Sequence, residues 1–132
     1  MPRISRLVLL VGLAVGVSDA SAQTAGGGAQ RFPDVVAAKA QARGADVFDF
    51  DVTVSSPYDT PQRYADAFRV FGKDGRAYGE RILLHDHAGE QPFTRDLYGV
   101  RIPQGVRVVV VQARDMKHGY GGKTVEVALP GR

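Results

Sequence analysis

The chain has 132 residues, no cysteine and a formal net charge of +3 at pH 7. A chain without cysteines holds no disulfide, so its fold must rest on an apolar core, which about 100 residues can form. The basic residues are spread along the sequence rather than clustered, which argues against a nucleic-acid partner.

The first 22 residues have the pattern of a secretory signal peptide. Arg3 and Arg6 precede an uninterrupted apolar run over 7–17, and the small residues of 20–22 suit a signal peptidase. The apolar run is too short to span a bilayer, and there is no cysteine for lipid attachment. We therefore expect cleavage after Ala22, no membrane anchor in the mature chain, and a periplasmic or secreted location.

The next segments predict a flexible lead-in followed by a first strand. Residues 23–33 begin with a small, polar, glycine-rich stretch that is typical of a linker. In residues 34–43, the alanine content and an Asp34 cap favour a helix. The alternation of apolar and polar residues that starts at Val36 favours a strand instead. We favour the strand, because a hairpin through 44–46 into the next strand needs little loop.

Alternating apolar and polar residues predict six further strands. The clearest covers 46–54, where phenylalanines and valines alternate with Asp49 and Asp51, which we expect on a solvated face. Tight turns rich in glycine or proline and longer polar loops separate the strands. The strands expected after this one are 63–71, 77–84, 93–102, 106–115 and 124–129.

The order of the strands places their connections at two ends of the domain. If successive strands run antiparallel, every second connection lies at the same end, so the tight turns share one end. The loops 55–62, 85–92 and 115–122 share the other end, and loops at one end of a rigid sandwich commonly carry function. The binding residues that we expect in these loops are Tyr58, Asp59, Asp86, Glu90, Asp115 and Tyr120.

All three histidines of the chain lie in the same loops. His85 and His87 are two residues apart, so in an extended segment their rings point to the same side. His118 from the last loop could add a third nitrogen, and three histidines with an open position suit copper or zinc. The alternative is that the three rings are solvated or hydrogen-bonded loop side chains.

Residues 34–130 therefore predict a single all-β domain, an antiparallel β-sandwich of about seven strands. Because GVRIPQGVRVVVVQARD leads into its last strands and KTVEVALP closes it, the domain resembles immunoglobulin-like and fibronectin-type-III-like modules. It lacks the tryptophan, the cysteine pair and the tyrosine corner of antibody domains. EQPFTRDLYGVRIP together with HGYGGKTVEVALP also resembles small exported bacterial proteins, a resemblance that implies no activity.

No grouping of residues indicates catalysis. Ser55 and Ser56 lie in a proline-containing loop rather than in a nucleophile elbow. The sequence GGKT at 121–124 lacks the first glycine of a phosphate-binding loop, because Lys117 stands there. We predict an exported, non-enzymatic binding or accessory module that meets a protein or glycan partner through the loop end. The alternative is a small copper- or zinc-binding protein that uses the three histidines.

Overall fold

A computed structural model of the chain describes residues 30–132. The predicted signal peptide, 1–22, and the predicted lead-in up to residue 29 lie outside the described residues. Residues 30–132 contain seven strands, and no helix there is long and apolar enough to cross a membrane. The strands are β1 (Asp34–Gly44), β2 (Val47–Ser55), β3 (Ala65–Gly72), β4 (Ala77–Ile82), β5 (Phe93–Arg101), β6 (Val108–Asp115) and β7 (Gly119–Ala128).

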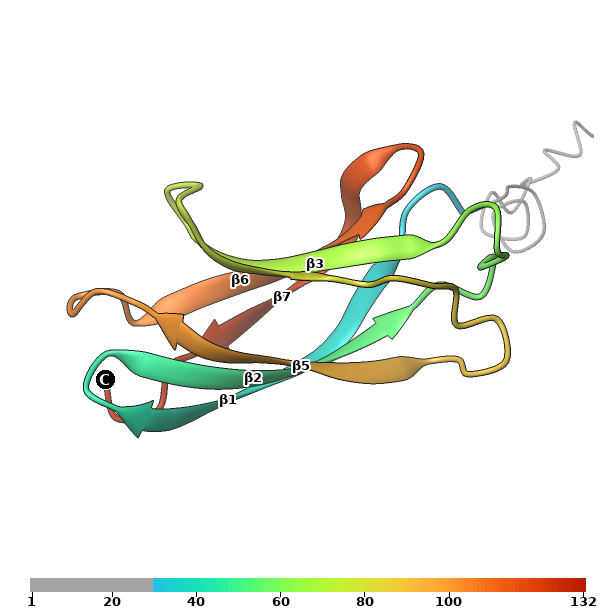
Figure 1. Cartoon of the computed structure of the whole chain (residues 1–132). Helices are drawn as coiled ribbons and strands as arrows, with labels where there is room; N and C mark the ends of the chain where they lie inside the picture. The colour runs from blue at the N-terminus through green and yellow to red at the C-terminus, as the bar shows by residue number, and fades with distance from the viewer. Residues whose placement is uncertain (1–29) are drawn as a thin grey trace, which may run out of the picture.

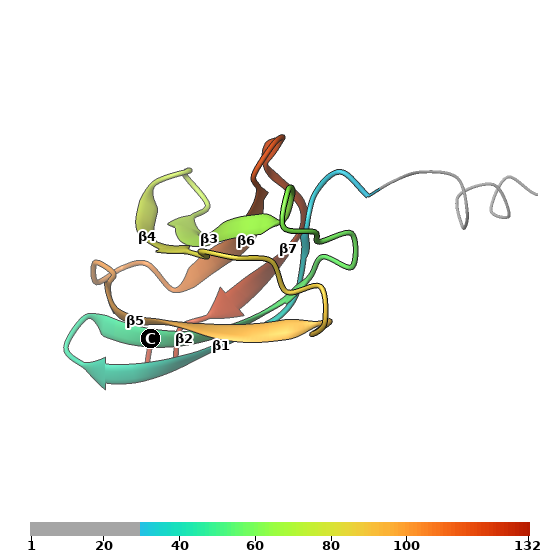
Figure 2. The ribbon, with the colours of Figure 1, turned by 45° about the vertical axis from the view of Figure 1, so that its right-hand side comes forward.

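The strands form two antiparallel sheets that face one another (Figure 1). One sheet has three strands in the order β1-β2-β5, and the other has four in the order β4-β3-β6-β7. In the turned view of Figure 2 the sheets lie as two layers, and the chain passes between them after β2, β4 and β5. The predicted all-β fold, antiparallel pairing and seven strands are confirmed.

Apolar side chains from the inner faces of both sheets fill the space between the layers. Alternation along β2 and β6 turns every second side chain inward. Each side chain buried in this way contributes about 1.5–3 kcal/mol to stability. The prediction that the phenylalanines and valines of 46–54 face the core is therefore confirmed. Phe93, at the start of β5, is buried at the edge of this core. Fully buried members of the core are Phe50, Val52, Val54, Phe68, Val70, Phe93, Ile102, Val109 and Val111.

The ambiguous segment 34–43 is a strand, as we favoured, but its predicted alternation is wrong at the start. Val35 is buried, whereas Val36 is 50% exposed. The reason is a bulge that makes Val36 an extra residue against β2 and reverses the faces before it. After the bulge, Ala38 and Ala40 pack against the core as the alternation predicts.

Asp49 does not lie on a solvated face, which corrects the prediction for this residue. Its side chain accepts a hydrogen bond from the Gly99 amide at 2.9 Å and forms an ion pair with Arg43 at 2.6 Å. The amide reaches it because Gly99 has a positive φ of 71° in an irregular part of the β2–β5 pairing. Asp51, two residues on, is exposed as expected.

The strand β7 begins earlier than the sequence predicts. The expected loop 115–122 is reduced to a turn at 116–118, and Tyr120 lies in the strand. The glycines that suggest a loop belong to an irregular ladder with β6, in which Gly119 and Gly122 have φ values of +85° and +74°. Glycine tolerates this backbone, so the irregular segment still pairs as a strand.

Candidate functional site

Three loops gather at one end of the sandwich, as strand order predicts. They cover 56–64, 83–92 and 116–118. In Figure 1 the first two lie at the end of the molecule away from the C-terminus. The third loop joins the first directly, because the Met116 amide donates a hydrogen bond to the Tyr64 carbonyl at 3.0 Å. We call these three segments the loop end.

Asp59 holds the first two loops together. Its side chain is only 4% exposed, and its two oxygens accept hydrogen bonds from the amides of Ala65 at 3.1 Å and His87 at 3.0 Å. Gln91 makes a second link, since its side-chain oxygen accepts the Ser56 amide at 2.7 Å. A buried carboxylate that binds backbone amides fixes the loops that supply them.

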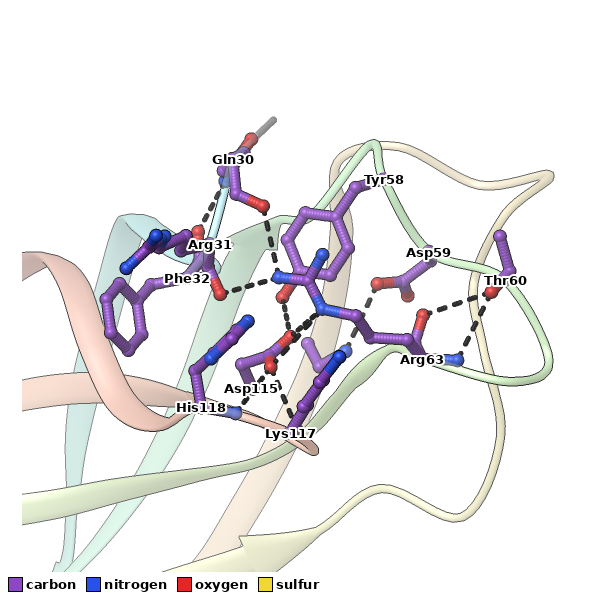
Figure 3. A network of polar contacts seen from close by, with 11 residues as sticks. Gln30, Arg31, Phe32, Tyr58, Asp59, Thr60, Arg63, Asp115, Lys117 and His118 are labelled. Atoms are coloured by element: carbon purple, nitrogen blue, oxygen red, sulfur yellow. Dashed lines mark hydrogen bonds and ion pairs between the residues drawn. The ribbon is translucent and has the colours of Figure 1, made fainter. Parts of the chain in front are cut away.

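Asp115 is the centre of a second network (Figure 3). Its fully buried carboxylate accepts hydrogen bonds from Tyr58 Oη at 2.7 Å and Arg63 Nε at 3.1 Å. The amides of Lys117 and His118 donate to it at 2.9 and 2.8 Å. Burial alone would raise the pKa of Asp115, but these hydrogen bonds outweigh burial and hold the pKa below its usual range.

Arg63 connects this network to the start of the described chain. Its Nη2 donates to the carbonyls of Gln30 at 3.1 Å and Arg31 at 2.8 Å, and its guanidinium lies 4.3 Å from the Tyr58 ring centre. Figure 3 shows the Arg63 side chain reaching from the 56–64 loop to the N-terminal segment. The last part of the predicted lead-in, 30–33, is therefore held against the domain rather than free.

The three histidines do not meet. The ring of His118 lies edge-on to Phe32, at 6.1 Å between ring centres. His85 and His87 are 4.9 Å apart in another loop, and His87 stacks on Phe93 at 3.9 Å. Within the described part of the chain, no group of three or more His, Cys, Asp or Glu side chains could hold a metal ion. The structure therefore does not bring the three predicted histidines together as one ligand group, and copper or zinc binding stays a prediction.

Three of the predicted binding residues face the interior of the loop end. The carboxylates of Asp59 and Asp115 are buried and already bonded to the chain. Tyr58 donates its hydroxyl proton to Asp115, and burial together with this hydrogen bond raises the pKa of Tyr58 well above its usual value. These side chains therefore position the loops rather than face solvent.

Tyr120 belongs to a cluster on the four-stranded sheet. Its hydroxyl donates to Glu80, and burial followed by this hydrogen bond raises the pKa of Tyr120. The Arg69 guanidinium lies 4.0 Å from the centre of its ring, and that of Arg114 lies 5.7 Å away. Sequence reasoning missed this cluster because its members come from β3, β4, β6 and β7, and only the strand register brings them together.

The remaining two predicted binding residues lie in the 83–92 loop. Asp86 accepts the Ala88 amide at 3.1 Å within a local turn. The exposed Glu90 receives two hydrogen bonds from Arg95, at 3.1 and 3.0 Å, and these lower the pKa of Glu90. Both carboxylates therefore stay near the surface of the loop end.

A small cavity that the sequence did not predict lies beside this loop. Its volume is about 140 Å³, and its lining includes Arg81, Arg95, His85 and His87. The two arginines come from different sheets, and Arg81 joins the sheet edges by donating to the Asp96 carbonyl at 2.9 Å. In the sequence, this cavity is indicated only by the two arginines, Arg81 and Arg95, that lie on either side of the His85-Asp86-His87 segment.

A larger cavity of about 480 Å³ opens at the opposite end of the sandwich, beside Phe48 and Arg132. The Arg132 guanidinium is already engaged there. It donates to Asp46 at 2.9 Å and to the Ile102 carbonyl at 2.8 Å, and it lies 4.9 Å from the Phe48 ring centre. The arginine thus joins the segments at this end of the sandwich, which carries the tight turns and which we call the turn end. We therefore place the candidate site at the loop end instead.

We expect His87 to make the folded state less stable in mild acid. Burial, with Arg95 and His85 adding to it, lowers the pKa of His87 below the ordinary 6.5. The unfolded chain therefore takes up this proton first. The free energy of unfolding should fall as the pH drops through about 6.5 towards the folded-state pKa. Urea unfolding from about pH 7.5 to about pH 5 measures this slope.

The control for this prediction is His87→Phe, which keeps an aromatic ring on Phe93 but cannot titrate. Nδ1 of His87 is buried and bonds to no other group in residues 30–132. Its replacement should therefore change stability at neutral pH by less than about 1 kcal/mol. The variant should also show a flatter pH dependence. An unchanged slope would assign the acid sensitivity to another group.

The chain is similar to a protein of Halomicrobium mukohataei named "Putative lipoprotein", with 37% identity over 97 residues. The alignment covers 74% of this chain and 47% of the relative, so the chain spans about half the length of the curated relative it matches. No protein-family model matches the chain. No solved structure gives a significant match either.

Proposed function

We propose that the protein is an exported, non-enzymatic binding or accessory module that acts through the loop end. The observation that carries this proposal is that two buried carboxylates, Asp59 and Asp115, fix the three loops against one another. A surface that is ordered before it meets a partner loses less conformational freedom on binding. Fixed loops on a rigid sandwich are a common place for recognition.

Export is supported by two independent observations. Residues 1–22 carry the basic, apolar and small-residue pattern of a signal peptide. The similar protein of Halomicrobium mukohataei bears a lipoprotein name, which fits a place in the cell envelope or beyond it. We therefore place the mature protein in the periplasm or outside the cell. Mass spectrometry of fractionated cells should find a mature chain that begins at Gln23, and an intact cytoplasmic chain would contradict export.

We infer further that the sandwich is a divergent immunoglobulin-like domain of the fibronectin-type-III kind. The first, second and fifth strands form one sheet, while the third, sixth and seventh belong to the other, a grouping shared with immunoglobulin-like modules. The fourth strand pairs with the third, whereas in constant-type immunoglobulin domains it joins the first sheet. This pairing supports the fibronectin-type-III assignment.

A variant of the loop end is expected to lose its partner. His85 and Lys117 are exposed on two of the three loops, so His85→Ala with Lys117→Ala removes surface groups and leaves the buried networks intact. The matched control, Lys73→Ala with Arg76→Ala, changes two exposed residues at the turn end. Immobilised protein is incubated with cell-envelope extract or a glycan array. The loop-end variant should retain about tenfold less partner than the wild type and the control.

Both double variants should melt at the wild-type temperature, because the changed side chains are exposed. A shared loss of partner in both would show that binding does not depend on the loop end. Equal retention of partner by both would do the same. Either result contradicts the proposed function.

A further inference from the structure

We propose that the cavity beside the 83–92 loop binds a short aliphatic carboxylate. The inference deepens the proposed function and rests on it, because it names a ligand class for the loop end. The cavity, at about 140 Å³, is smaller than the usual range for drug-sized ligands. It therefore suits a small anion better than a nucleotide or a sugar chain. Its lining combines basic groups with aliphatic side chains: Arg81, Arg95, His85, His87, Ile82 and Leu84.

The first argument is the charge of the cavity. Two guanidinium groups and two imidazoles line it, and no carboxylate of residues 30–132 does. Partners engage only part of each guanidinium: Arg81 uses Nη1 to bind Asp96, and Arg95 uses Nη1 and Nη2 to bind Glu90. Within the described chain, Nε and Nη2 of Arg81 and Nε of Arg95 bond to no other protein group. These N–H groups suit the two oxygens of a carboxylate.

The second argument is the state of His87. Its side chain is 6% exposed, and its Nδ1 has no hydrogen-bond partner in the described chain, although buried polar groups are ordinarily paired. Burial lowers its pKa, and the neighbouring Arg95 and His85 lower it further. Asp59 and Glu90 act in the opposite direction without reversing the shift. A bound anion would supply the negative charge that this group lacks.

The third argument is the apolar side of the cavity. Leu84 is 83% exposed and Ile82 is 47% exposed, although large apolar side chains are usually covered. Both sit next to the arginines and histidines rather than alone on the surface. A ligand with a carboxylate and a short alkyl chain would satisfy both halves of the lining. The juxtaposition therefore favours an aliphatic carboxylate over an inorganic anion.

Titration of the purified protein with butyrate tests the proposal. Nuclear magnetic resonance should show saturable shifts of the His87 ring and the Leu84 methyl groups. Arg95→Gln should weaken binding about tenfold or more, because it removes a charge-assisted contact. Arg76→Gln, an exposed arginine at the turn end, is the matched control and should leave the affinity unchanged.

The ligand and the pH provide two further readouts. n-Butylammonium should not bind, and inorganic phosphate should bind more weakly than butyrate. Because an anion favours protonated His87, butyrate affinity should be higher at about pH 5.5 than at about pH 7.5 in the wild type, and this increase should be smaller in His87→Phe.

Several results would overturn the proposal: no saturable shift, an Arg95→Gln affinity equal to that of wild type, or phosphate binding as tightly as butyrate. The same pH dependence in the wild type and in His87→Phe would overturn the part of the proposal that places the anion beside His87. None of these results bears on partner capture by the exposed His85 and Lys117, so failure here is distinguishable from failure of the proposed function.

Discussion

Replacement of Asp115 by alanine should lower the free energy of unfolding by about 3–5 kcal/mol. The carboxylate is fully buried. Its removal leaves the Arg63 guanidinium without its anion and the Tyr58 hydroxyl without its acceptor. The two amides at the start of the β6–β7 turn also lose their acceptor. Such a loss is a large share of the roughly 5–15 kcal/mol that stabilises a typical domain. Urea unfolding at neutral pH measures it.

Two control variants separate the network from the charge alone. Asp51→Ala removes an exposed carboxylate from β2 and should change stability by no more than about 0.5 kcal/mol. Asp115→Asn keeps the shape of the side chain and loses its charge, so it should fall between wild type and Asp115→Ala. If Asp115→Ala were as stable as Asp51→Ala, the network would not be what holds the loop end together.

The same carboxylate should produce a pH dependence in strong acid. The pKa of Asp115 in the folded state lies below the ordinary value of 3.8, so the unfolded chain binds this proton first as the pH falls. Its contribution is complete above about pH 3.8 and is lost as the pH drops through the lower folded-state value. Unfolding curves of wild type should converge there with those of Asp115→Asn. Parallel curves would contradict the lowered pKa.

The strands could be predicted because alternation is a local signal. The buried face of β2 can be predicted from its own sequence, without reference to any other strand. Its apolar side chains occupy every second position: Phe48, Phe50, Val52 and Val54. The gathering of the loops at one end needs only the antiparallel order of successive strands. Where alternation fails, at Val36, the cause is a bulge whose position depends on the partner strand.

The buried networks could not be predicted, because their members are far apart in sequence. Asp115 and Arg63 are 52 positions apart, and Asp59 and His87 are 28 apart. From the sequence, a charged residue in a polar loop looks exposed. Local patterns do not show whether a hydrogen-bond donor from a distant part of the chain lies beside it in the fold. The histidines illustrate the same limit: His118 shares an end of the sandwich with His85 and His87, but its ring lies against Phe32, while that of His87 stacks on Phe93.

The glycines of β7 illustrate the same limit and lead to a second large effect. The φ of Gly122 is +74°, and a Cβ added there would lie 2.0 Å from the carbonyl oxygen of Pro33 and 3.0 Å from a carboxylate oxygen of Asp34. Gly122→Ala thus combines a strained backbone with a clash against the backbone of a buried residue. We expect a loss of about 2–5 kcal/mol, of which about 1–2 kcal/mol is backbone strain.

The matched control for this prediction is Gly119→Ala, because Gly119 also has a positive φ, of +85°, but has no atom within 4 Å of an added Cβ. It should lose only the cost of the strain, about 1–2 kcal/mol. The amide of Lys123, which donates to Asp34 at 2.8 Å, reports whether the N-terminal segment stays on β7. Its hydrogen exchange should become faster in Gly122→Ala and change little in Gly119→Ala. Equal losses in the two variants would mean that the close approach of Pro33 contributes nothing, and that backbone strain accounts for both.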